Sequence, residues 1–380
     1  VMRAVEMYER AVAQDPNFAR AYARLALAHL AVYTTRVDWS QSRLDSGEKS
    51  LRKAVDLDLD SAEVLLAQAG YEDDFERNLD LLRQARLAMP GNPEPALDIA
   101  LLYRDYGDWE KALEQFDKII ELDPCNDRFL FFRGITHLFL RHREMADQDL
   151  DRVVAISPDF GAAYLFKLRG QLHSGRSIRE MECFADSADV VQHLDEVNRM
   201  WFHWMAALYE REFAKGIQYL DHCNWDGELV YEQPHEYFPR DSLYGIMFQL
   251  AGKTGPAKLK FESARAYIEA QIESAPFDWR LQIALGEIQA CLGRTVDAVK
   301  SARQGMEQAS GEIDKSFARI EAIMRVFLPA EDYESVFAEL DVYLASPGCW
   351  SIEGLLPNPR LDPIREDPRF QTLVDKYKRH

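Results

Sequence analysis

Apolar residues recur at spacings of three and four along most of the chain, with polar and charged residues between them. Side chains at this spacing fall on one face of an α-helix, so the pattern predicts amphipathic helices that pack through a shared stripe. Two consecutive stretches show the pattern, and each ends at a proline, which stops a helix. Their stripe positions are Ala112, Phe116 and Ile119 before Asp123-Pro124, and Ala146, Leu150 and Val153 before Ser157-Pro158.

The same arrangement repeats along the chain. Pro90, Pro124 and Pro158 are 34 residues apart twice in succession, and a fixed period of this size marks repeat architectures. Each of the helices that end at Pro124 and Pro158 is preceded by another apolar stripe. This stripe contains a small residue, Ala100 in the first case and Gly134 in the second, at which a neighbouring helix can approach closely. The repeating unit is therefore predicted to be a hairpin of two helices.

These positions resemble the signature of the tetratricopeptide repeat (TPR), including Gly107 at the turn between the two helices. Similar stretches run from residues 4–17 to residues 320–347. The resemblance implies an all-α fold, an α-solenoid of about eight or nine TPR-like helical hairpins forming a right-handed superhelix. Because each hairpin buries its apolar face only against its neighbours, such an array has a concave groove, lined by the first helix of each hairpin.

The regularity of the repeat varies along the chain and predicts four segments. We expect an N-terminal TPR array at 1–173, an irregular aromatic-rich helical join at 174–236, a C-terminal TPR-like array at 237–350, and a Pro-rich cap with a terminal helix at 351–380. In the third segment, the helix that contains Phe261 is predicted to continue about two extra turns to Pro276.

The closing residues 355–371 contain more proline than a helix allows. They resemble the closing motif of TPR regions that follow a cyclase, Ser/Thr kinase or winged-helix domain in bacterial signalling proteins, although Leu361 stands where that group usually has Trp. We expect this segment to cap the array and to cover its last helix pair with Leu361, Ile364, Phe370 and Leu373. Because Val1 falls inside a second helix, we also expect the sequence to be a piece of a longer protein.

Composition and charge narrow the range of partners. The 380 residues include 45 Lys and Arg against 64 Asp and Glu, a net charge of −19, which repels a phosphate backbone. Direct nucleic-acid binding is therefore not expected. The sequence has no run of 18 apolar residues, so no membrane insertion within this chain is predicted. Five cysteines without a CxxC pair favour reduced thiols and a cytoplasmic location, and the resemblance allows a periplasmic one if a membrane helix precedes the region.

Signatures of catalysis are missing from the sequence. The Gly-Lys-Thr sequence at 252–254 lacks the earlier glycine and the strand of a phosphate-binding loop, so it is predicted to be a turn between helices. His203, His222, Cys223 and His235 do not have the spacing of a metal site. No metal or cofactor is predicted, and the chain is not expected to be an enzyme. A small-molecule receptor or metal-dependent enzyme built on these residues is a less favoured alternative.

Residues off the packing stripe of the first helices are predicted to point into the groove. Arginine and phenylalanine on one surface suit a peptide with an acidic or carboxylate end and an apolar anchor. In the opposing interpretation Phe131 or Phe132 merely packs against the adjacent hairpin. The candidate partner-binding residues are Arg104, Arg128, Phe131, Phe132, Ile135, Phe139, Phe166, Arg169 and His173.

Aromatic residues concentrate between Trp201 and Phe248, where they make up twelve of 48 residues. Most are expected to fill the core of the join. Because Trp and Tyr dominate binding hot spots, Trp201, Trp204 and Trp225 form a secondary candidate surface.

The function expected from these features is that of a non-catalytic sensor or scaffold region of a bacterial multidomain signalling protein. It would bind a peptide or protein partner in its groove and regulate an attached effector domain. A stand-alone, self-associating scaffold is the alternative. A chaperone-tail partner is not expected, because the groove positions hold Ala, Leu, Asp and Phe rather than the Lys, Asn and Arg set that such TPR domains share.

Overall fold

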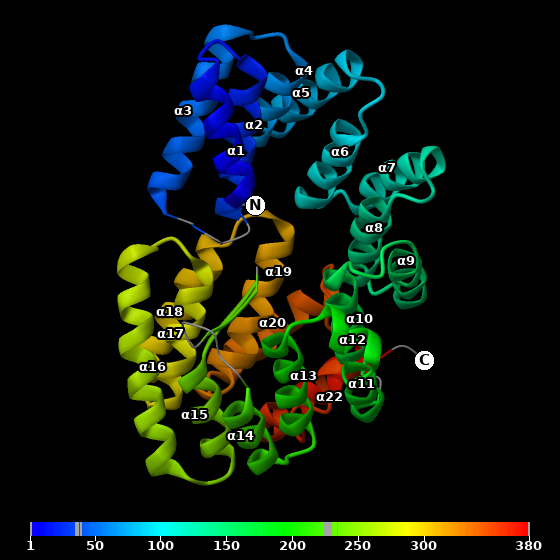
Figure 1. The fold of residues 1–380 in the computed structure, drawn as a ribbon. Coiled ribbons are helices and arrows are strands. Elements are labelled where there is room, and N and C mark those ends of the chain that lie inside the picture. The colour runs from blue at the N-terminus through cyan, green and yellow to red at the C-terminus, as the bar shows by residue number, and fades with distance from the viewer. Residues whose placement is uncertain are drawn as a thin grey trace. The chain divides into compact units, whose positions relative to one another are not determined.

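The computed structural model describes residues 2–34, 38, 40–175, 177–223 and 235–378, and the backbone of 230–233. Apart from one short β-hairpin, these residues form helices and their connections, which confirms the predicted all-α solenoid of TPR-like hairpins (Figure 1). The chain divides into two compact units, unit 1 (residues 1–129) and unit 2 (residues 130–380). The four predicted segments follow the regularity of the repeat instead, and they stay a prediction.

Unit 1 contains an opening helix, three helical hairpins and the start of a fourth. Val5 of the opening helix packs against Leu25 and Val32, so it covers the first complete hairpin as a neighbouring second helix does. The elements are α1 (Met2–Gln14), α2 (Ala19–Thr34) with α3 (Gln41–Leu57), α4 (Ala62–Gly70) with α5 (Phe75–Ala88), α6 (Glu94–Asp105) with α7 (Trp109–Leu122), and the first residues of α8 (Asp127–Phe139).

Unit 2 contains six hairpins, which brings the described chain to nine and agrees with the predicted eight or nine. A short helix, α12 (Ala188–His193), and a two-stranded antiparallel sheet, β1 (Val230–Gln233) with β2 (Glu236–Pro239), interrupt the array. The hairpins are α8 with α9 (Arg143–Ile156), α10 (Gly161–His173) with α11 (Ile178–Ala185), α13 (Glu196–Tyr209) with α14 (Phe213–His222), α15 (Arg240–Leu250) with α16 (Thr254–Ser274), α17 (Trp279–Cys291) with α18 (Thr295–Gln308), and α19 (Gly311–Glu321) continued by the π-helical turn η1 (Ala322–Phe327) with α20 (Tyr333–Ala345).

Six of the nine described hairpins share one turn geometry. The residue two positions before the second helix has a positive φ, and the next N–H donates to the carbonyl five residues back, as Asp108 does to Tyr103. Glycine adopts this conformation without strain, and Gly107 and Gly252 do so with φ of 82° and 72°. Gly252 follows α15, so the predicted turn between helices at 252–254 is confirmed. The α16 helix that follows has 21 residues, which confirms its predicted extension toward Pro276.

The closing segment caps unit 2. It forms α21 (Ile352–Leu355), the 3-10 helix η2 (Pro359–Ile364) and α22 (Pro368–Tyr377). The four residues expected to cover the last helix pair are all buried, and α22 packs on α20. Burying large apolar side chains at the end of an array stabilises it, because an uncapped terminal repeat exposes its core face to water.

Unit 2 also closes on itself through contacts between its first hairpins and the end of α20. The amide of Gly348 donates to the carbonyl of Phe139 at 2.8 Å, and the amide of Ser351 donates to the carbonyl of His173 at 3.0 Å. The Arg141 guanidinium donates to four carbonyls between Tyr343 and Trp350. The concave side of this array is therefore covered by other parts of the same unit.

Across the described residues, the helices are all too short or too polar to qualify as membrane spans.

Candidate peptide-binding groove

A cavity of about 480 Å³ lies on the side of unit 1 that the first helices face. Its walls come from α2, α4 and α6, with contributions from α5 and from Arg128 at the start of α8. This is the arrangement that the TPR resemblance predicted, since hairpin stacking places successive first helices side by side on one face. The groove is the open surface of the described chain that best matches the expected binding face.

One wall of the groove is apolar. The side chains of Leu27, Leu30 and Leu101 are only half-buried, so they present aliphatic surface that a ligand can cover. Covering such surface is favourable by about 25 cal/mol per Å². The apolar lining residues are Leu27, Leu30, Ala31, Leu66, Ala69, Leu82, Leu101 and Leu102.

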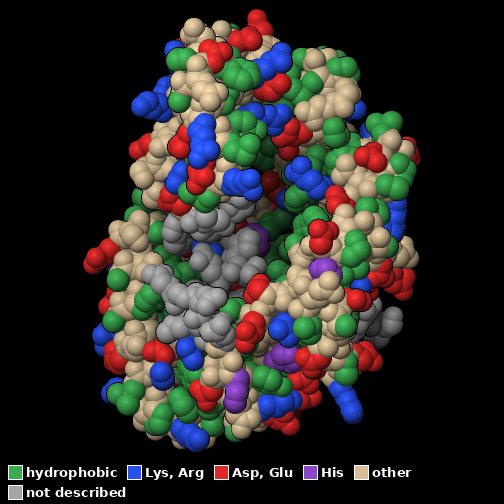
Figure 2. All heavy atoms as spheres, in the orientation of Figure 1, with side chains coloured by type: hydrophobic (Ala, Val, Ile, Leu, Met, Phe, Trp, Pro, Cys, Tyr) green, Lys and Arg blue, Asp and Glu red, His purple; other side chains and the backbone are tan. Residues whose placement is uncertain are grey.

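Charged side chains occupy the other part of the groove. Three carboxylates, Glu94, Asp98 and Asp105, line it with one guanidinium, that of Arg128. Glu94 is held by Arg24, whose Nη1 lies 3.0 and 2.9 Å from its two carboxylate oxygens. Asp105 accepts from Arg104 at 3.1 Å. The groove is therefore acidic on balance, although Lys, Arg, Asp and Glu are interspersed on the face of the molecule drawn in Figure 2.

Asp98 is the groove carboxylate with an abnormal protonation equilibrium. Its burial, reinforced by the negative charge of Glu94, raises the pKa of Asp98 to about 7, against the opposing effect of Arg128 and Arg24. Within the described part of the chain it accepts no hydrogen bond and forms no ion pair. A half-buried carboxylate without a partner is destabilising when ionised.

This pKa predicts a pH effect on stability. Asp98 binds its proton more tightly in the folded state, so its ionisation costs stability as pH rises from about 4 to 7. In Asp98→Asn this cost is absent, so the stability advantage of the variant should grow by about 2 kcal/mol between pH 5.5 and pH 8. Urea unfolding combined with hydrogen exchange in α6 measures it. Asp105→Asn, which removes an exposed carboxylate from the same helix, should show no such growth.

Two predicted groove residues belong to unit 1. Arg128 is exposed and lines the groove, and its role in binding a partner stays a prediction. Arg104 is buried and engaged with its neighbour Asp105, so its side chain does not line the groove.

The other predicted groove residues lie in unit 2, where the inner face is covered. Phe131 packs on Phe160 and Phe166, with ring centroids 4.9 and 5.5 Å apart, and Phe132 lies against the Phe131 ring. This matches the opposing interpretation, in which these rings pack within the array. Ile135 is also buried.

Three further groove candidates are covered by segments distant in sequence. Arg169 pairs with Glu236 of β2, and Phe139 packs edge-on against Phe317. The ring centroids of His173 and Trp350 lie 4.1 Å apart. The residues take inward positions as predicted, but the open groove expected there is wrong, because the β-hairpin and the residues after α20 fill it.

The secondary candidate surface is also corrected. Trp201 and Trp204 are 2% and 1% exposed, and α13 buries nearly all of its residues from Met200 to Tyr209. These rings belong to the core, as was expected for most of the aromatic residues between Trp201 and Phe248. Trp225 lies outside the described residues.

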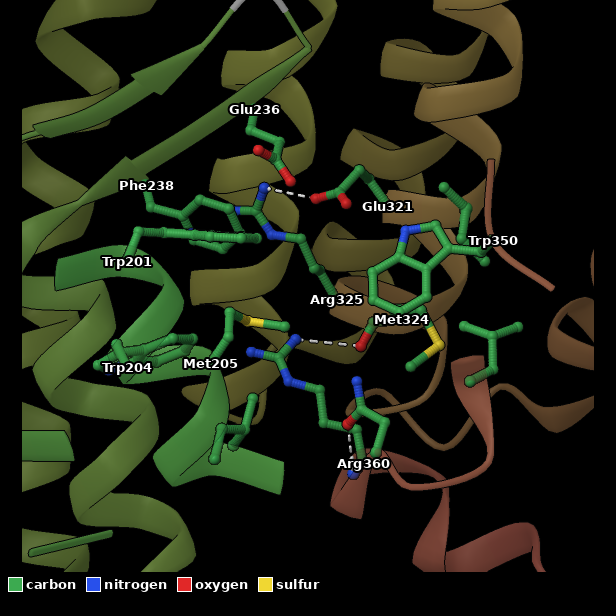
Figure 3. Close-up of a pocket in the computed structure, with 14 residues that line it drawn as sticks. Trp201, Trp204, Met205, Glu236, Phe238, Glu321, Met324, Arg325, Trp350 and Arg360 are labelled. Carbon is green, nitrogen blue, oxygen red and sulfur yellow. Dashed lines mark hydrogen bonds and ion pairs between the residues drawn. The ribbon is translucent and has the colours of Figure 1, made fainter. Parts of the chain in front are cut away.

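Trp201 and Trp204 line a small cavity of about 50 Å³ that also contains buried charges (Figure 3). Arg325 lines this cavity and bridges two carboxylates: its Nη2 lies 2.7 Å from Glu287 Oε2 and its Nη1 3.0 Å from Glu321 Oε2. Burial disfavours ionised Glu287, but Arg325 and Arg360 outweigh it and hold the pKa of Glu287 below its usual value. Burial raises the pKa of Glu321.

The charges in this cavity are matched by other side chains of the chain. Arg325 stacks 3.7 Å from the centroid of Phe238, so an internal cation already occupies that aromatic face. Arg360 Nη2 contacts the second oxygen of Glu287 at 2.7 Å. The cluster therefore holds β2, α17, η1 and η2 together, and the groove of unit 1 is the better candidate binding site.

The residues considered for a metal site do not come together. His203 pairs with Asp186, His235 pairs with Asp314 and stacks on Phe317, and His222 Nδ1 lies 2.7 Å from the carbonyl oxygen of Gln218. Nowhere in the described ranges do three or more His, Cys, Asp or Glu side chains gather as metal ligands would.

Sequence reasoning missed Asp98 and Glu94 as groove residues. The available signal was that Asp occurs among the groove positions of the first helices, beside the Arg and Phe residues that were predicted to bind. The sequence does not show whether each charged residue has an ion-pair or hydrogen-bond partner in the fold.

Comparison with known proteins finds relatives of low sequence identity. No protein-family model matches the chain. It is 22% identical over 349 residues to the CTR9 homolog of Arabidopsis thaliana, covering 82% of this chain and 31% of that protein. It is 24% identical over 274 residues to DnaJ homolog subfamily C member 3 of Rattus norvegicus, covering 66% and 48%.

The chain thus spans about a third and about half of the length of these curated relatives. Among solved structures, that of yeast Tom70 is similar with a TM-score of 0.46 and 14% identity, over 98% of this chain and 88% of that one. The class that the fold defines is a TPR-like helical repeat protein.

Proposed function

We propose that the groove of unit 1 binds an apolar segment of a protein partner, and that the chain acts as a non-catalytic interaction scaffold. The observation that carries this proposal is the cavity of about 480 Å³ on the first-helix face, whose aliphatic side chains are left partly exposed. Partly exposed leucines beside fixed charges are typical of sites for peptides with apolar anchors.

The test uses a displayed library of random 12-residue peptides as the probe, selected on the whole chain. Leu101→Arg places a charge on the apolar wall and should weaken binding of the selected peptides at least tenfold. Leu122→Arg is the matched control, because Leu122 is 80% exposed on α7 and does not line the groove. Fluorescence anisotropy measures both. Equal binding by the two variants, or no enriched peptide, contradicts the proposal.

We further propose that this interaction regulates an effector domain elsewhere in the native polypeptide. The support is the closing segment at 355–371, whose sequence resembles the end of TPR regions in bacterial signalling proteins. The curated relatives are a plant and a rat protein, so this role depends on the sequence resemblance alone. Mass and N-terminal sequence of the native polypeptide test it: an effector domain whose activity changes when this region is deleted is expected, and a free-standing chain would favour a self-associating scaffold.

A further inference from the structure

Asp98 is placed to contact a ligand, because it lines the groove and lacks a partner of its own. The other groove carboxylates are engaged, Glu94 by Arg24 and Asp105 by Arg104. In the described chain Asp98 alone among these three has neither a hydrogen bond nor an ion pair. A half-buried charge without a partner is costly, so a structure that keeps one at its binding surface gains when a ligand supplies the opposite charge.

The surroundings of Asp98 determine what that ligand group can be. The charged groups that act on it are Glu94 on its own helix, Arg24 from α2 and Arg128 from the start of α8. Arg24 is committed to Glu94, and Arg128 is exposed. The surfaces that α4 and α5 contribute to the groove carry no charge: Leu66, Ala69, Gly70, Asn78 and Leu82. A cation that reaches Asp98 therefore passes between aliphatic walls.

We propose that Asp98 binds a lysine or arginine side chain of the partner peptide, whose neighbouring side chains are apolar and cover the walls of the groove. This inference rests on the proposed peptide-binding function and names the class of peptide. The long aliphatic stem of Lys or Arg packs on apolar surface while its charged end reaches a carboxylate. An acidic peptide would instead bring like charges to Glu94 and Asp98, which is unfavourable.

Binding of this cation is linked to proton release. In the free groove the pKa of Asp98 is about 7, so the carboxyl is protonated in about half of the molecules at pH 7. The ammonium or guanidinium group of the peptide stabilises the carboxylate, and the carboxyl proton passes to solvent. Affinity therefore falls as pH drops below 7, by up to about tenfold per pH unit.

The test begins with the same random peptide library and the whole chain. Enriched peptides whose binding is weakened by Leu101→Arg should contain Lys or Arg between apolar residues. A selected peptide and its copy with norleucine in place of the basic residue are then titrated calorimetrically. The basic peptide should bind about 20-fold more tightly at pH 7.5 than at pH 5.5, and it should release about half a proton at pH 7 in buffers of different ionisation enthalpy.

Asp98→Asn should weaken binding of the basic peptide at least tenfold, remove its pH dependence and leave the norleucine copy unaffected. Asp80→Asn is the matched control, because Asp80 on α5 is an exposed carboxylate that does not line the groove, and this variant should retain the preference and the pH dependence. Library peptides that bind the groove without a basic residue, or an Asp98→Asn variant that binds as the original chain does, would overturn this inference and leave the proposed function standing. Failure to enrich any peptide sensitive to Leu101→Arg would overturn both.

Discussion

Replacing Arg325 with methionine is expected to lower the free energy of unfolding of unit 2 by about 3–5 kcal/mol. Arg325 is 3% exposed, and its loss leaves Glu321 without a cation and Glu287, which is 0% exposed, with Arg360 alone. Removing one partner of a buried ion pair has costs of this size, because an uncompensated charge stays in the interior. Methionine keeps much of the contact with Phe238, so the loss reports mainly on charge. Urea unfolding measures it.

Arg303→Met is the matched control for this prediction. Arg303 also pairs with a carboxylate, Glu339 at 2.6 Å, and also lies over a ring, that of Phe327 at 4.9 Å, but its side chain is 43% exposed. An exposed pair of this kind contributes about 1 kcal/mol or less. Equal losses in the two variants would contradict the prediction.

A second variant keeps the prediction testable if Arg325→Met folds poorly. In Glu321→Gln combined with Arg325→Met, the carboxylate that lost its cation is replaced by a neutral side chain of the same shape. The double variant should recover at least about 1 kcal/mol relative to Arg325→Met alone. No recovery would show that the uncompensated charge of Glu321 is not the source of the loss.

The helical hairpins were predictable from the sequence because they are local. The stripe residues Ala112, Phe116 and Ile119 lie within two turns of one helix and are all buried. Gly134 was identified as a point of close approach, and a Cβ built there would lie 3.3 Å from Asp149 and Leu150. The repeat period, the turn between the helices and the proline that stops the second helix can thus all be recognised within about 34 residues. These local features are enough to predict a repeat fold.

The closure of unit 2 was not predictable from the same pattern. It depends on hydrogen bonds between residues about 200 positions apart, such as Arg141 with Trp350. An arginine at a hairpin turn looks like any solvated charge in the sequence, and Arg211 at the equivalent turn stays half-exposed in a pair with Asp362. Arg169 and His173 were therefore assigned to an open groove, although Glu236 and Trp350 cover them.

The candidate site was predictable in position but not in chemistry. Stacked first helices place a groove on one face, and Arg128 lies in it. Whether Asp98 is paired depends on the rotamers of Arg24 and Arg128, which periodicity does not determine. The acidic or carboxylate end predicted for the peptide was derived from the arginines, whereas the basic side chain that we propose is derived from the carboxylates of unit 1.

Replacing Arg141 with alanine is expected to lower the free energy of unfolding of unit 2 by about 3 kcal/mol. Its guanidinium donates to the carbonyls of Trp350, Ser346, Leu344 and Tyr343 at 3.0 to 3.3 Å. Hydrogen bonds from a charged donor contribute about 1.5–3 kcal/mol each when made singly, and less when several share one group. In the alanine variant these carbonyls accept hydrogen bonds from water or have no hydrogen-bond donor. Arg141→Lys should lose less, because an ammonium reaches only some of them.

Arg211→Ala is the matched control, because Arg211 occupies the equivalent turn position of another hairpin with φ of 60°, against 58° for Arg141. Both substitutions keep a Cβ at a positive φ, so the backbone strain of the turn cancels in the comparison. Arg211 pairs with Asp362 in a half-exposed position, and its loss should cost about 1 kcal/mol or less. Hydrogen exchange at Ser346, Gly348 and Trp350 should accelerate in Arg141→Ala only. Equal losses of stability, or unchanged exchange at these amides, would show that Arg141 does not hold the closure of unit 2.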